Sequence, residues 1–82
     1  MQFLATVRVV LKPTVNDPQG LTVQSALGSL GFDSVTRVRV GKHLEVALEA
    51  ADREEAAGLV REMCRQLLAN PVIETFDYEL AG

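Results

Sequence analysis

The sequence predicts a small α+β domain in which strands and helices follow one another in the order β-α-β-β-α-β. Two observations favour this class: some segments alternate apolar and polar residues, and two others carry apolar residues at helical spacing after an Asp. The chain has 82 residues, of which 48% are hydrophobic, so we expect residues 1–82 to form a single folded domain. A domain of this size has a small core and gains stability from association with another chain.

Residues 3–11 alternate as a strand does, and Pro13 ends this strand because proline cannot donate to a β-ladder. A helix then begins at Asp17-Pro18, where an N-cap residue precedes a proline whose φ is already helical. Gly31 stands where a left-handed glycine ends many helices. The apolar stripe of this helix consists of Val23, Ala26, Leu27 and Leu30.

Residues 35–40 and 44–50 are expected to form a β-hairpin around a three-residue loop, residues 41–43. This register pairs the apolar residues of the two strands with one another, whereas a two-residue loop would set them opposite charged residues. On the other face, Arg39 would then lie across from Glu45.

The second helix begins at Asp52, with Glu55 as its capping-box partner, and ends at Asn70-Pro71. A last strand follows over residues 72–80. The stripe expected to be buried on the helix consists of Ala56, Leu59, Val60, Met63, Cys64 and Leu67. Right-handed crossovers would place both helices on one face of a four-stranded antiparallel sheet, which is the ferredoxin-like arrangement.

Composition excludes several functions. The net charge is −3, whereas nucleic-acid binders carry an excess of basic residues, so we expect no nucleic-acid partner. No apolar run approaches the ~20 residues of a membrane span, and the N-terminus does not resemble a signal peptide, so we expect a cytoplasmic protein without membrane contact. A single cysteine, Cys64, fits a reducing compartment.

The sequence offers no catalytic residues and no metal site. His43 is the only histidine and Cys64 the only cysteine, and together they cannot build a structural zinc site. The glycines do not have the spacing of a phosphate-binding loop. A basic cluster, formed by Lys12, Arg37, Arg39 and Lys42, could be a solvated ion-pair face or a docking site for an acidic partner or phosphate. The sheet face without helices likewise could be solvated or could associate.

Four segments in order carry a family resemblance: Leu11-Lys12-Pro13, Asp17-Pro18-Gln19-Gly20, Val38-Arg39-Val40-Gly41-Lys42 and Leu67-Leu68-Ala69-Asn70-Pro71-Val72-Ile73-Glu74. This series resembles the PurS-type small subunits of phosphoribosylformylglycinamidine synthase, the glutamine-dependent ligase of de novo purine synthesis. The resemblance implies a non-catalytic subunit, present as a homodimer or tetramer. It would join a ligase subunit, which binds ATP and Mg²⁺, to a glutaminase subunit that releases ammonia.

The resemblance also implies a set of interface residues, without saying which partner each one contacts. The set consists of Asp17, Gln19, Gly20, Arg39, Gly41, Lys42, Asn70 and Pro71. Asp17, Gly41 and Asn70 also have structural explanations as cap, turn residue and helix stop. The alternative is a stand-alone regulatory domain of the ACT type, which has the same element order and binds a small molecule.

Overall fold

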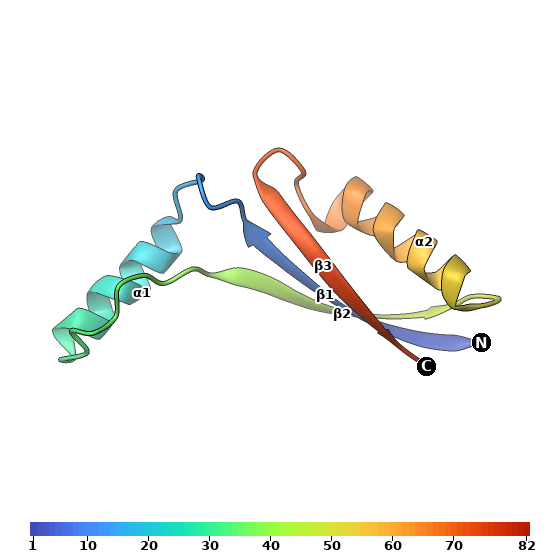
Figure 1. Cartoon of the computed structure of the whole chain (residues 1–82), viewed down its shortest axis with the longest axis horizontal. Coiled ribbons are helices and arrows are strands. Elements are labelled where there is room, and N and C mark those ends of the chain that lie inside the picture. Colours follow the sequence, from blue (N-terminus) through green and yellow to red (C-terminus); the bar gives the residue numbers. More distant parts are fainter.

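The computed structural model describes all residues from 1 to 82 (Figure 1). Three strands, two α-helices and one short π-helix follow one another along the chain. Their bounds are β1 Gln2–Leu11, α1 Pro18–Ser29, β2 Gly41–Glu49, α2 Arg53–Met63, η1 Cys64–Leu68 and β3 Glu74–Ala81. The α+β class is therefore confirmed. No helix is both long enough and apolar enough to cross a membrane.

The sheet has three antiparallel strands in the order β2-β1-β3, so β1 lies in the centre. The alternating pattern of β1 is confirmed, because its apolar side chains Phe3, Ala5, Val7 and Val9 are buried. α2 covers that face of the sheet, with Val60 and Cys64 packed into the same core. The opposite face carries Arg8, which lies between His43 of β2 and Asp77 of β3.

The predicted hairpin is wrong. Residues 41–43, expected as its loop, are the first residues of β2 and pair with β1. Residues 35–40 are not part of any strand, so the predicted pairs Val40–Leu44 and Arg39–Glu45 do not form. The sheet has three strands instead of the predicted four. The physical reason is that the chain continues past Gly41 without turning back.

The two helices do not lie together on one face of the sheet, which corrects a second expectation. As predicted, Asp17 caps the start of α1 and Gly31 follows its C-terminal end with a φ of +96°. However, α1 projects away from the sheet at the end opposite to α2 (Figure 1). The molecule is therefore extended: its longest dimension is 51 Å, and its radius of gyration is 16.3 Å, whereas a compact domain of this length would have about 12 Å.

We call α1 and the residues after it up to residue 40 the arm, and the three strands with α2 and η1 the body.

The end of α2 also differs from the prediction, because a π-turn over Cys64–Leu68 inserts an extra residue. In this turn the Ala69 N–H donates to the Cys64 carbonyl oxygen at 3.0 Å. Leu67 is consequently 83% exposed, and Leu68 packs against the core in its place. Val72, the first residue of the predicted last strand, precedes β3 and is exposed.

Candidate functional site

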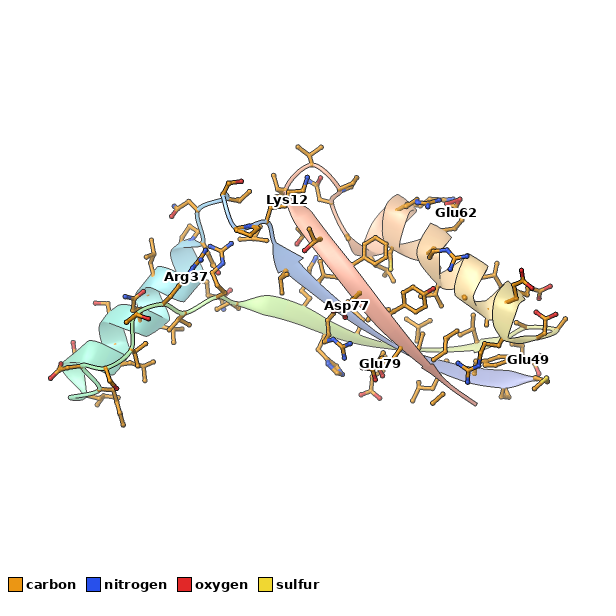
Figure 2. All side chains as sticks on the ribbon, viewed as in Figure 1. Lys12, Arg37, Glu49, Glu62, Asp77 and Glu79 are labelled. Carbon is orange, nitrogen blue, oxygen red and sulfur yellow. The ribbon has the colours of Figure 1, made fainter.

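The joint between arm and body brings together most of the interface residues predicted from sequence. The chain leaves the body after β1 and returns at the start of β2, where Val10 lies opposite Gly41. Lys12 and Arg37 flank this place in Figure 2. The predicted residues that meet here are Asp17, Gln19, Gly20, Arg39, Gly41 and Lys42.

Asp17 connects the segment that enters the arm to the segment that leaves it. Its Oδ1 accepts the Gly20 N–H at 2.9 Å as a helix N-cap, and its Oδ2 accepts the Val40 N–H at 2.8 Å. The side chain is buried. The bond from Val40, followed by the bond from Gly20, lowers the pKa of Asp17, because both bonds stabilise its charged form. Asp17 therefore does more than cap α1: it also fixes the end of the arm against its beginning.

Arg39 holds the same loop from the other side. Its guanidinium donates to the carbonyl oxygens of Lys12 at 2.9 Å, Val15 at 3.1 Å and Leu11 at 3.3 Å. Arg37, two residues earlier, donates only to the Pro13 carbonyl at 3.3 Å and is exposed. Arg39 was expected across from Glu45, and the structure instead gives its guanidinium three backbone carbonyl partners.

Glycine is required at two positions of the joint because backbone approaches closely. A Cβ at Gly20 would collide with the Val38 carbonyl oxygen, and a Cβ at Gly41 would lie 2.6 Å from the Val9 carbonyl oxygen. Contacts this short do not occur for real Cβ atoms. These glycines let the arm pack its helix onto residues 35–40 and let β2 begin against β1.

A cavity of about 220 Å³ opens at the joint, next to the side chains of Gln19 and Lys42. Lys42 Nζ lies 3.6 Å from Glu74 Oε2 across this cavity. Glu74 was not among the residues predicted for the site. Its signal was available, because Glu74 shares the inward face of the last strand with Phe76, where a charged residue needs a partner.

Glu74 connects the joint to Asn70. Its Oε1 accepts the Asn70 N–H at 2.7 Å, and Asn70 Oδ1 accepts the Val72 N–H at 3.0 Å. Asn70 therefore shapes the turn before β3. Pro71 lies apart, beside Cys64 and Phe76 at a second cavity of about 290 Å³.

The open face of the sheet carries an ion cluster. Arg8 Nε lies 2.7 Å from Asp77 Oδ1, and Arg8 NH2 lies 3.0 Å from Glu79 Oε1. Figure 2 shows Asp77 and Glu79 on the side of the sheet away from α2. All three side chains are exposed, so the cluster contributes little to folding and forms part of a polar, accessible surface.

None of these groups forms a catalytic constellation. His43 lies in β2, where its Nε2 is 4.0 Å from Glu45 Oε1, and both side chains are exposed. Cys64 is buried in the core, and burial raises the pKa of its thiol, so the reactive thiolate is disfavoured. No group of three or more His, Cys, Asp or Glu side chains is placed to hold a metal ion.

Comparison with known proteins shows which family this chain is similar to. Residues 4–82 match PurS, described as phosphoribosylformylglycinamidine (FGAM) synthase. The PurS subunit of that synthase from Bacillus subtilis is 50% identical over 78 residues, which cover 95% of this chain and 92% of that protein. The PurS subunit from Synechocystis sp. is 49% identical over 74 residues, covering 90% and 74%. The chain belongs to the PurS family.

Solved PurS structures share its shape. PurS from B. subtilis superposes with a TM-score of 0.88 at 46% identity, covering 98% of this chain and 99% of that one. A chain in the structure of PurLQS from Thermotoga maritima gives 0.90 at 30% identity, covering 99% of both chains. Scores of this size over nearly the whole chain mean that the arm projects from the body in those proteins too.

The resemblance predicted from the four sequence segments is therefore confirmed, and the chain is a subunit of FGAM synthase, a ligase of purine biosynthesis. The ACT-type alternative is not favoured by these matches. The contacts that Gln19, Lys42 and the other joint residues make in the assembled enzyme remain predictions.

Proposed function

We propose that this chain is the bridging subunit of a cytoplasmic FGAM synthase complex and contributes surfaces to it. It joins a glutaminase subunit to a ligase subunit, so that ammonia released from glutamine reaches the ligase without loss to water. It acts as a homodimer or larger assembly. It holds no cofactor itself, because ATP and Mg²⁺ belong to the ligase subunit.

One observation carries this proposal. The chain superposes over 99% of its length on a chain of the T. maritima structure named PurLQS. Cys64 is buried in the core and burial raises the pKa of its thiol, which agrees with a role in packing. The joint offers Gln19 and Lys42 as exposed polar side chains whose surroundings are rigidly fixed by Asp17 and Arg39.

The test is reconstitution with purified ligase and glutaminase subunits. Adding this chain should restore FGAM synthesis from glutamine, whereas synthesis from free ammonium should depend on it much less. Equal glutamine-driven rates with and without the chain would refute the proposal. Substituting Gln19→Glu should lower the glutamine-driven rate selectively, and Gln66→Glu, on the exposed side of η1, is the matched control.

A further inference from the structure

The cavity at the joint lies where segments from four parts of the chain meet. It is lined by the end of β1, the N-terminal turn of α1, the start of β2 and the start of β3. Its volume of about 220 Å³ is smaller than the roughly 300 Å³ or more of a site that encloses a drug-sized molecule. The cavity therefore suits a ligand of amino-acid size and is too small for a nucleotide.

Three polar side chains of this cavity have hydrogen-bonding groups that the protein leaves unused. The Lys42 ammonium and the Gln19 carboxamide form no hydrogen bond with another residue. Glu74 uses only its Oε1, which accepts the Asn70 N–H, and its Oε2 lies 3.6 Å from Lys42 Nζ, too far for a hydrogen bond. The Glu74 side chain is 14% exposed, whereas that of Lys42 is 57% exposed. The cavity therefore offers one fixed acceptor and one movable donor.

The charges around the cavity favour a ligand that carries both signs. Asp17 and Glu74 both line it, so they repel a free anion such as phosphate. A free cation meets the Lys42 ammonium, and an apolar ligand would cut Glu74 Oε2 off from water without giving it a partner. Both oxygens of Asp17 already accept backbone N–H groups, so Glu74 Oε2 is the acceptor left for a ligand. A zwitterion meets all of these conditions.

We propose that this cavity binds a small α-amino acid, whose ammonium group donates to Glu74 Oε2 and whose carboxylate accepts from Lys42 Nζ. The two charged groups of an α-amino acid are attached to one carbon atom, so they fit between a carboxylate and an ammonium that lie close together. The Gln19 carboxamide both donates and accepts, and it therefore matches a ligand with a carboxamide side chain, as in L-glutamine. This site is additional to the bridging role.

The exchange of contacts on binding is favourable. The ion pair between Lys42 and Glu74 is long and partly exposed, and such pairs contribute little to stability. Hydrogen bonds between charged groups are shorter and stronger, and the ligand would form two of them in place of this one loose pair. Lys42 reaches the ligand because its long side chain is flexible, whereas Glu74 is already oriented by its bond from Asn70.

The test is a titration of the purified chain, followed by ¹H–¹⁵N correlation NMR and calorimetry. L-glutamine should bind with a dissociation constant of about 1 mM or lower and shift the amide signals of residues 40–42 and Glu74. Glutaramate, which lacks only the α-ammonium group, and 4-aminobutanamide, which lacks only the α-carboxylate, should each bind at least about 10-fold more weakly. No shift at about 20 mM L-glutamine, shifts confined to other residues, or equal binding of either analogue would overturn the proposal. No other enzyme subunit is present, so the result does not depend on the bridging function.

Two variants assign each charge of the ligand to its partner. Glu74→Gln keeps an oxygen for the Asn70 N–H but removes the negative charge, so it should bind L-glutamine only about as weakly as glutaramate. Lys42→Met should likewise bind L-glutamine about as weakly as 4-aminobutanamide. Glu62→Gln, which changes an exposed carboxylate of α2 paired only with Arg65, is the control and should bind like the wild type. Unchanged discrimination in both cavity variants would contradict the site, and the wild-type analogue comparison decides the question if they do not fold.

Discussion

At the scale of single residues, Asp17 fixes how the arm leaves the body. The sequence predicts its bond to Gly20, because the N-cap signal lies within four residues. Its bond to Val40 joins positions far apart in the chain, so no local pattern could indicate it. Glu74 carries a local signal, a charge on the inward face of the last strand, but that signal does not identify its partner Lys42, which lies in another strand.

Substituting Asp17→Asn should destabilise the folded chain at neutral pH, because a carboxamide offers only one acceptor oxygen for two backbone amides. The pKa of Asp17 is lowered in the folded state, so its contribution is present above the unfolded pKa and is lost as pH falls through the folded pKa. The difference in unfolding free energy between wild type and variant should therefore shrink on acidification.

Urea unfolding at several pH values between neutral and strongly acidic measures this difference. Asp33→Asn, an exposed carboxylate without hydrogen bonds in the arm, is the control and should show little difference at any pH. A gap between wild type and Asp17→Asn that stays constant across the whole range would show that the carboxylate charge does not matter.

At the scale of elements, the π-turn at the end of α2 decides which leucine enters the core. An α-helical spacing predicts Leu67 at the core, but the inserted residue of Cys64–Leu68 turns Leu67 outward and Leu68 inward. π-turns are rare and have no simple sequence signature, so the exchange could not be predicted.

Truncating Leu68 and Leu67 to alanine should have clearly different effects on the free energy of unfolding. Leu68→Ala should cost about 1–3 kcal/mol of unfolding free energy because it removes packed methyl groups, whereas Leu67→Ala should change it by about 0.5 kcal/mol or less. Chemical denaturation of both variants under the same conditions makes the comparison. A larger loss for Leu67→Ala would mean that α2 ends without the π-turn.

The sequence predicts both helices, their caps and the strands β1 and β3, because their signals are local. It does not predict the state of residues 35–49, since an alternating segment has the same pattern whether it turns back or continues straight. Residues 41–43 also lack the Asn-Gly or Asp-Gly pair that would enforce a tight turn. The choice between hairpin and extended strand is therefore made by the pairing of residues 41–43 with β1, which no local pattern encodes.

At the scale of the whole molecule, the extended shape links folding to association. The arm has few contacts with its own body, so much of its apolar surface can be buried only in an assembly. Stability that comes from association depends on the concentration of the chain.

The thermal unfolding midpoint of the purified chain should therefore rise by several degrees between about 1 and 100 μM, because binding shifts the folded state by mass action. Calorimetry or circular dichroism over this range measures the shift. An identical midpoint at all wild-type concentrations would indicate that the isolated chain is already fully stabilised.

β3 remains at the outside of the sheet, and it carries Asp77 and Glu79 beside their shared partner Arg8. A second β3 that approached edge to edge would bring like carboxylates against one another, which is how natural edge strands avoid further pairing. The same carboxylates therefore oppose polymerisation, because the sheet cannot extend across β3 into a filament.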